Sequence, residues 1–137
     1  MAQCWLFKTE PSAYSYDRLE SERTTVWDGV KNPLARKHLA AVKRGDRVLI
    51  YHTGDEKAVI GVAKAASDAY RDPCDAAAPV VDLTAAGRLA RAVTLAELKA
   101  RPSLKSFPLV RLPRLSVMPV NAAEWREIER LSKQRPE

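Results

Sequence analysis

Trp27 is the residue of this 137-residue chain whose setting points most directly to a ligand. It stands in the polar string WDGVKN, residues 27–32, which is typical of a turn. An indole ring can stack on a flat ligand while neighbouring polar groups pair with the ligand's edge. The alternative is that Trp27 plugs the end of a barrel as a core residue. Trp5, in a strand pattern, and Trp125, on a helical stripe, are expected in the core.

Two further polar strings have side chains suited to bases or phosphates. Lys8, Thr9 and Glu10 follow directly on a strand pattern, and loops at strand ends commonly carry binding groups. Arg111 and Arg114 lie three residues apart, and arginine pairs with phosphate or stacks on a base. The plain alternatives are a surface ion pair with a turn at the first string and two solvated arginines at the second.

Signals for catalysis are weak. The sequence has no GxGxxG, GxxxxGK[ST], HExxH or GxSxG string. His52 has the chemistry of a general base, but a hydrogen-bonded core histidine is the preferred interpretation. Cys74 is followed by Asp75, whose charge opposes the thiolate that a nucleophile needs. Because the cysteines and histidines also lack metal-ligand spacing, we expect no metal, no cofactor and no enzyme.

The chain is basic, with 23 Lys and Arg against 17 Asp and Glu. The excess lies in residues 91–137, which hold ten basic and five acidic side chains. Such a surplus suits a polyanionic partner, although it also keeps a small domain soluble. No apolar run reaches the roughly 18 residues of a membrane span, and Lys8 and Glu10 interrupt any signal-peptide pattern. We expect one cytoplasmic, monomeric domain over residues 1–137, away from membranes.

Capping signals and periodicity outline the elements that position these residues. The predicted strands cover residues 3–8, 47–53, 58–66 and 80–89. The predicted helices start at the capping residues Ser15, Asn32, Thr94 and Asn121. The helix after Asn32 is expected to end near Gly45, and Gly61 indicates a bulge or a close approach of another backbone.

The remaining segments are irregular. Residues 67–79 are predicted to form a loop, and residues 107–120, broken by prolines, at most short strands. Residues 132–137 are predicted to fray. This alternation is too irregular for a doubly wound parallel sheet. It favours the α+β class, as a small, strongly curved antiparallel sheet or barrel with helices packed around it.

Four strings, taken together and in order, resemble the EVE domain family. They are CWLFKTEPSAYSYDRL, WDGVKNPLARKHL, GDRVLIYHTGDEKAVIGVAK and RLPRLSVMPVNAAEWREI, and they run from Trp5 to Ile128. The resemblance implies a PUA-like fold, a curved β-barrel surrounded by short helices, related to YTH and ASCH domains. It also implies a non-catalytic module that reads a modified base, methylated or hydroxymethylated, in DNA or RNA.

The same resemblance implies a base-binding pocket. Its residues would be Lys8, Thr9, Glu10, Trp27, Asp28, Gly29, Val30, Asn32, Tyr51, His52, Thr53, Arg114, Leu115 and Ser116. Trp27 would stack on a flipped base, while Asn32 and Thr53 would pair with its edge. Arg111 and Arg114 would bind phosphates.

Three positions depart from many relatives of that family: Pro33, Thr53 and Pro113. They bear on which base is recognised rather than on the fold. Two alternatives for the function stay open. One is a small-molecule protein that binds a free nucleobase or nucleotide. The other is a nucleic-acid-processing enzyme in which His52 works with Asp28 or Glu10.

Overall fold

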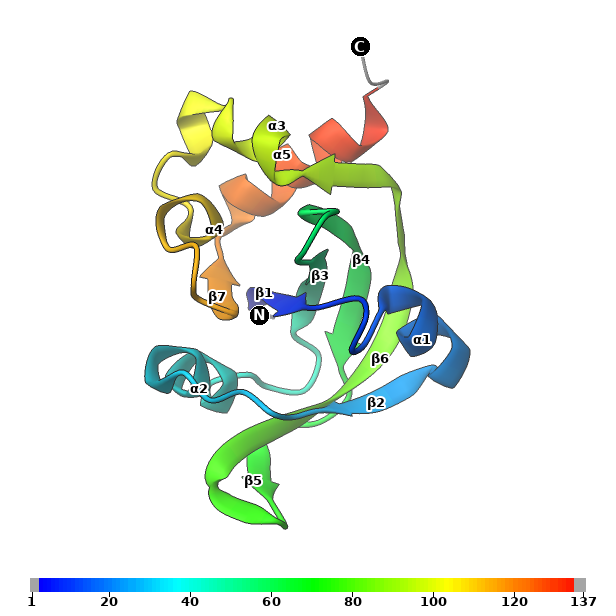
Figure 1. The fold of residues 1–137 in the computed structure, drawn as a ribbon, viewed down its shortest axis with the longest axis vertical. Helices are drawn as coiled ribbons and strands as arrows, with labels where there is room; N and C mark the ends of the chain where they lie inside the picture. The colour runs from blue at the N-terminus through cyan, green and yellow to red at the C-terminus, as the bar shows by residue number, and fades with distance from the viewer. Residues whose placement is uncertain (1–2, 135–137) are drawn as a thin grey trace.

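Seven strands form one mixed, strongly curved sheet (Figure 1). The structure is a computed structural model, and it describes residues 3–134. The strands are β1 (Cys4–Thr9), β2 (Thr24–Trp27), β3 (Arg47–His52), β4 (Ala58–Ala65), β5 (Tyr70–Asp72), β6 (Asp75–Thr94) and β7 (Val117–Val120). Their order across the sheet is β2, β6, β4, β3, β1, β7, and β5 pairs with β6. The long β6 thus joins β2, β4 and β5 into one layer.

Short helices surround this sheet. Within the described residues they are α1 (Tyr16–Glu22), α2 (Pro33–Ala40), α3 (Leu95–Lys99), α4 (Pro108–Arg111), α5 (Ala122–Lys133) and the 3₁₀ helix η1 (Pro102–Leu104). Four predicted helix caps are confirmed, since each side chain accepts a backbone N–H of the first turn: Ser15, Asn32, Thr94 and Asn121. No helix between residues 3 and 134 is long and apolar enough to cross a bilayer.

The pairing of β1 with β3 corrects the prediction of an antiparallel barrel. These two strands run parallel, with Lys8 opposite Tyr51, whereas the other strand pairs are antiparallel. The chain between them contains α1, β2 and α2, and a crossover of that length allows β3 to start at the same end as β1. The α+β class is confirmed, with a mixed sheet.

Element boundaries differ from the prediction in the first half of the chain and around β5. Helix α2 ends at Ala40 rather than near Gly45, because the N–H of Ala41 already turns back to the His38 and Leu39 carbonyls. The predicted loop over residues 67–79 contains β5 and the start of β6. This hairpin escaped prediction because much of it is exposed and lacks an alternating apolar pattern.

The C-terminal elements are also more regular than predicted. The predicted strand over residues 80–89 is only the middle of β6, and residues 107–120 contain α4 as well as β7. Ser132 does not fray: it is buried in α5, and its hydroxyl donates to the Glu129 carbonyl at 2.6 Å. Residues 135–137 of the predicted tail lie outside the described residues.

Tyr16 anchors α1 in the sheet by packing on Gly61, where a bulge or a close approach of another backbone was predicted. The strand register shifts beside Gly61, which confirms the bulge, and the close neighbour is the Tyr16 ring rather than a backbone. A Cβ at position 61 would lie 2.6 Å from Cζ of the Tyr16 ring, so only glycine fits. The Tyr16 hydroxyl donates to the Val62 carbonyl at 2.8 Å and accepts from the Gly87 N–H at 3.0 Å. These contacts hold residues 10–15 beside the ends of β1 and β3.

Alternation along β1 divides the core into two layers. Trp5 and Phe7 point to one face, where they pack against His38 of α2 and Trp27 of β2. Lys8 points to the other face and reaches Pro113, in the segment after α4. Figure 1 shows α3, α4 and α5 together at one end of the molecule and α2 and β5 toward the other.

Candidate nucleic-acid interface

The carboxyl ends of β1 and β3 lie side by side because these strands are parallel. Lys8 Nζ lies 5.6 Å from the centre of the Tyr51 ring and donates to the Pro113 carbonyl at 2.8 Å. Burial lowers the pKa of Lys8 and raises the pKa of Tyr51. A cation and a phenol from two predicted strings are therefore in direct contact.

A cavity of about 330 Å³ opens next to this pair, and we call it the strand-end cavity. Its lining residues are Lys8, Tyr51, Thr53, Gly54, Lys57, Leu95, Lys99, Leu109, Val110 and Pro113. Three lysines thus face an apolar wall from α3 and α4, and these lining residues include no carboxylate. Ligand pockets commonly measure about 300–1,000 Å³, so a nucleobase or nucleoside fits the size.

Lys57, which sequence reasoning missed, occupies an unusual place in this wall. Its φ of 45° lies in the left-handed region that residues other than glycine rarely adopt. Its carbonyl accepts the Leu95 N–H at 2.7 Å, which ties the β3–β4 turn to the start of α3. Backbone strain of this kind often occurs at ligand sites.

Thr53 lines the cavity and is hydrogen bonded to Thr9 and Glu10, which do not line it. The Thr53 N–H donates to the Thr9 carbonyl at 2.9 Å, and the Thr53 hydroxyl donates to Glu10 Oε2 at 3.0 Å. The Thr9 hydroxyl donates to the Tyr14 carbonyl at 2.7 Å. Since a hydroxyl that donates one bond can still accept another, Thr53 remains able to accept from a base amino group.

The fourth predicted string meets the second at a neighbouring cavity of about 310 Å³, the loop cavity. It is lined by Asn32, Leu34, Leu112, Pro113, Arg114 and Leu115. Ser116 lies one residue further on, and its carbonyl accepts the Lys8 N–H at 2.9 Å. The loop and strand-end cavities share Pro113, whose carbonyl binds Lys8. All four predicted strings therefore contribute lining residues to these two adjacent cavities.

Trp27 lies deeper than its predicted stacking role suggests. Its side chain is 8% exposed, and its ring packs 5.5 Å from Phe7 and 6.1 Å from Tyr14, centre to centre. It lines neither the strand-end nor the loop cavity. Stacking by Trp27 stays a prediction, while this packing favours the alternative that it closes the end of the barrel. Its neighbours Asp28 and Gly29 are exposed, and Val30 is buried.

Both ring nitrogens of His52 face partners in the fold. Nε2 accepts the Tyr16 N–H at 3.0 Å, which places the proton of the neutral ring on Nδ1. Nδ1 lies 3.0 Å from Glu56 Oε1. His52 is buried and lines neither cavity. No cluster of three or more His, Cys, Asp or Glu residues suited to a metal occurs between residues 3 and 134.

Arg111 and Arg114 are both exposed, at the end of α4 and in the segment before β7. Sequence reasoning missed Lys57, Lys99 and the apolar wall of α3 and α4. These residues come from separate elements, and no spacing in the sequence connects them to the strand ends.

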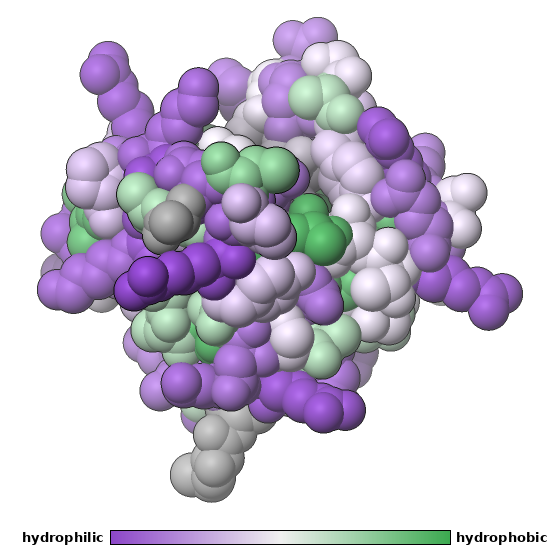
Figure 2. All heavy atoms as spheres, turned by 90° about the horizontal axis from the view of Figure 1, so that it is seen from below, coloured by the Kyte–Doolittle hydropathy of each residue, from purple (hydrophilic) through white to green (hydrophobic). Residues whose placement is uncertain are grey.

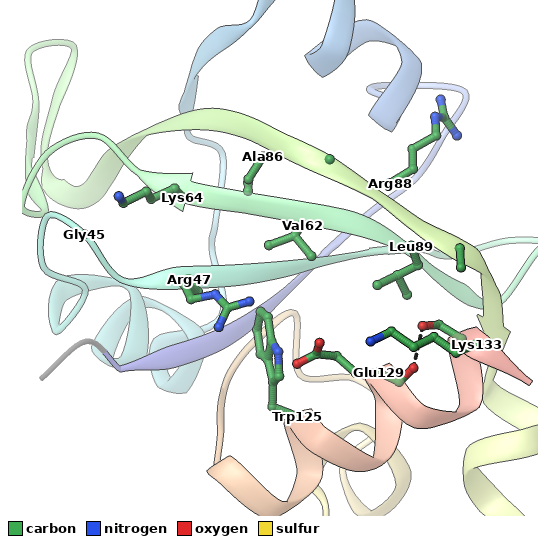
Figure 3. Close-up of a pocket in the computed structure, with 14 residues that line it drawn as sticks. Gly45, Arg47, Val62, Lys64, Ala86, Arg88, Leu89, Trp125, Glu129 and Lys133 are labelled. Atoms are coloured by element: carbon green, nitrogen blue, oxygen red, sulfur yellow. Dashed lines mark hydrogen bonds between the residues drawn. The ribbon is translucent and has the colours of Figure 1, made fainter.

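A third cleft, of about 440 Å³, lies between α5 and strands β3, β4 and β6, and we call it the α5 cleft (Figure 3). The guanidinium of Arg47 lies 4.4 Å from the centre of the Trp125 ring. Figure 3 shows Glu129 and Lys133 extending from α5 into the same cleft. The α5 cleft contains no residue of the predicted site.

Comparison with known structures supports the predicted fold. The solution structure of Rpa0253 from Rhodopseudomonas palustris superposes with a TM-score of 0.92 at 37% identity, over 99% of this chain and 97% of that one. The curved sheet and its helices belong to the PUA-like class, as the match to a structure of human THYN1 shows. The family model of the EVE domain matches residues 3–131, and the chain belongs to the EVE domain family.

Two matches to this chain are human, and one of them is a structure that contains DNA. Thymocyte nuclear protein 1 from Homo sapiens is 28% identical over 96% of this chain and 75% of its own length. A structure of human THYN1 protein in complex with 5-methylcytosine containing DNA superposes with a TM-score of 0.89 at 25% identity. That match covers 98% of this chain and 100% of the other. The predicted family is confirmed, and one relative of the same fold binds DNA with a modified base.

Proposed function

We propose that this protein is a non-catalytic nucleic-acid-binding module that reads a modified base flipped into the strand-end cavity. The observation that carries the proposal is the cavity itself, where Tyr51 and three lysines meet an apolar wall without a carboxylate. The human relative in complex with 5-methylcytosine containing DNA makes that DNA the first partner to test.

In this proposal the flipped base lies between the Lys8 ammonium, which sits over the Tyr51 ring, and the apolar wall. Tyr51 is 3% exposed, so its ring supports Lys8 rather than stacking on the base. Flipping costs a few kcal/mol in a duplex and less in a single strand, and burial of the base against the apolar wall offsets part of that cost. The Lys8 ammonium has three N–H donors, and one is used by Pro113, so it can also bind a base carbonyl or a phosphate. Arg111 and Arg114 then bind phosphates of the nucleic-acid backbone.

Leu109 and Val110 offer the surface on which a methyl group would be buried. Burial of one methyl group is worth about 0.8 kcal/mol, a factor of about four in affinity. Stronger selection requires that the unmodified base leave a polar group unpaired or an ordered water in place. We therefore expect a methyl preference of a few-fold for contacts with Leu109 and Val110 alone.

Fluorescence polarisation with matched oligonucleotides tests the proposal. Single- and double-stranded probes would carry cytosine, 5-methylcytosine, 5-hydroxymethylcytosine, adenine or N6-methyladenine, each at two salt concentrations. We expect tighter binding of one modified probe and a steep loss of affinity with salt. Salt-sensitive binding of equal affinity for modified and unmodified probes would contradict recognition of a modified base.

A free nucleobase or nucleotide is the second candidate ligand, because the strand-end cavity is large enough for a single nucleoside. Tight binding of a mononucleotide with little dependence on salt would favour this small-molecule function over DNA. The placement of His52 gives the enzyme alternative little support, since His52 lines neither cavity and its Nε2 accepts the Tyr16 N–H.

A further inference from the structure

A groove between α2 and β5 lies next to the loop cavity. It measures about 480 Å³ and is lined by Pro33, Arg36, Lys37, Ala40, Ala69, Tyr70, Arg71, Ala77 and Pro79. Pro33 in this groove stands between Asn32 and Leu34 in the chain, and both of those residues line the loop cavity. The strand-end cavity, the loop cavity and this groove therefore adjoin one another in that order.

Cations predominate among the residues that line this path. Arg114 lies at the loop cavity, and Arg36, Lys37 and Arg71 line the groove, whose lining residues include no carboxylate. Two carboxylates lie beside the groove: Asp75 is 3.8 Å from the Arg36 guanidinium, and Asp82 accepts the Tyr70 hydroxyl. A row of cations that extends away from a base pocket suits the phosphates of one nucleic-acid strand.

Large apolar side chains are exposed along the same path. Leu34 is 43% exposed at the loop cavity, and Tyr70 is 39% exposed in the groove. Figure 2 views the molecule from the end where α2 and β5 lie, and near-neutral and apolar residues gather there among long hydrophilic side chains. Exposed apolar groups between cations are a common feature of surfaces that bind single strands.

Tyr70 is held in a fixed position that suits stacking. Its hydroxyl donates to Asp82 Oδ1 at 2.6 Å, across the β5–β6 hairpin. This hydrogen bond raises the pKa of Tyr70 to about 12, and it fixes the direction of the ring on the exposed side of the hairpin. A ring with few remaining rotamers loses little entropy when a base stacks on it.

We propose that the groove between α2 and β5 binds the single strand that flanks the flipped base, with Tyr70 stacked on a flanking base and Arg36, Lys37 and Arg71 on its phosphates. This inference rests on the proposed function, because it places the flanking strand relative to the strand-end cavity. The occupant is the continuation of the same DNA strand.

The test compares a short single-stranded oligonucleotide that ends at 5-methylcytosine with two longer ones, extended on the 5′ or the 3′ side. For the wild-type protein, we expect one extension to raise affinity clearly. Tyr70→Ala should lower affinity for that longer probe about tenfold and leave the short probe unchanged. Arg71→Gln should reduce the salt slope of the longer probe by about 0.7, the value for one lost phosphate contact on a single strand.

Two control variants separate the ring from its hydrogen bond and from general charge. Tyr70→Phe keeps the ring but loses the bond to Asp82, so it should bind the longer probe less tightly than the wild type and more tightly than Tyr70→Ala. Arg126→Gln, at an exposed position of α5, should change neither affinity nor salt slope by as much. If Tyr70→Ala and Arg71→Gln bind the longer probe like the wild type, the groove is not the path of the strand.

Failure of the proposed function gives a different result. In that case the wild type shows no preference for the modified base, and Lys8→Gln leaves affinity for the short probe unchanged. The path along the groove is then judged on unmodified single strands alone, by the effect of Tyr70→Ala on the longer probe.

Discussion

The strand-end cavity and the α5 cleft lie near opposite ends of β3, with Tyr51 in one and Arg47 in the other. The lining of the strand-end cavity holds three lysines, and among the described residues none of them is in a salt bridge. The lining of the α5 cleft holds four cations and Glu129, and one of those cations, Arg88, is paired with Asp17 and Glu20. Trp125, which also lines this cleft, has a buried Nε1 donor without a partner among the described residues. The two linings thus carry a similar net charge, and the pairing of their cations, rather than volume, distinguishes them.

Trp125 of the α5 cleft and Trp5 of the core differ in the hydrogen bonding of the indole N–H, and their variants should differ in stability for that reason. Trp5 Nε1 donates to Asp46 Oδ2 at 2.9 Å in a buried setting, whereas Trp125 Nε1 donates to no acceptor among the described residues. Trp5→Phe leaves a buried carboxylate oxygen with one bond fewer, and we expect a loss of about 2 kcal/mol in the free energy of unfolding. Trp125→Phe should cost clearly less than that. Urea denaturation measures the free energy of unfolding of both variants. Equal losses would contradict the difference in hydrogen bonding between the two indole groups.

Variants of two lysines, one in the strand-end cavity and one in the α5 cleft, show by their effect on DNA affinity which of the two sites binds DNA. Lys8→Gln removes the cation at Tyr51, and we expect affinity for 5-methylcytosine DNA to fall about tenfold, as for a charged hydrogen bond. Lys133→Gln, in the α5 cleft, should change affinity by less than about twofold. Fluorescence polarisation at one salt concentration measures both variants. A larger loss for Lys133→Gln would move the interface to the α5 cleft.

Glu97 tests how firmly α3 supports the apolar wall. The hydrogen bond from Arg91 holds the pKa of Glu97 at about 2, well below its ordinary 4.5. Because the folded-state pKa is depressed, this pair stabilises the protein above about pH 4.5, and the contribution disappears as pH falls toward 2. Glu97→Gln can keep the capping box with Thr94, so it isolates the pair with Arg91. We expect a loss of about 1 kcal/mol at pH 7, because the pair is partly exposed.

Thermal unfolding of Glu97→Gln and wild type across pH checks this expectation. The difference in unfolding free energy should shrink as the carboxylate of the wild type is protonated. A difference that stays constant from pH 7 to strongly acidic conditions would show that Arg91 contributes nothing through charge.

Local signals in the sequence predicted the helix starts and the bulge beside Gly61, because caps and missing side chains act within a few residues. The parallel pairing of β1 with β3 was not predictable from such signals, since the crossover through α1, β2 and α2 decides it. The family resemblance rests on the four strings that supply lining residues to the two adjacent cavities, and base binding there stays a prediction. Lys99 carried no signal because only tertiary packing brings it to the cavity of Tyr51, and Lys57 resembles any other lysine of a hairpin turn.

Trp27 shows that polar neighbours in the sequence do not reveal how a ring packs. A tryptophan in a polar turn string suggested exposure, yet Phe7 and Tyr14 enclose its ring. The turn itself is exposed at Asp28, and the ring points back from it into the barrel. Trp27→Ala, measured for both DNA affinity and stability, separates stacking from packing. Base recognition in the strand-end cavity, the monomeric state and the cytoplasmic location stay predictions.

Amide chemical-shift mapping of the ¹⁵N-labelled protein with a 5-methylcytosine oligonucleotide tests the central claim most directly. The account predicts saturating shifts for Tyr51, Lys57 and Arg114, at the strand-end cavity and the adjoining loop cavity. The indole N–H resonance of Trp125 should stay nearly fixed. Shifts confined to the α5 cleft, with Tyr51 and Lys57 unchanged, would contradict it.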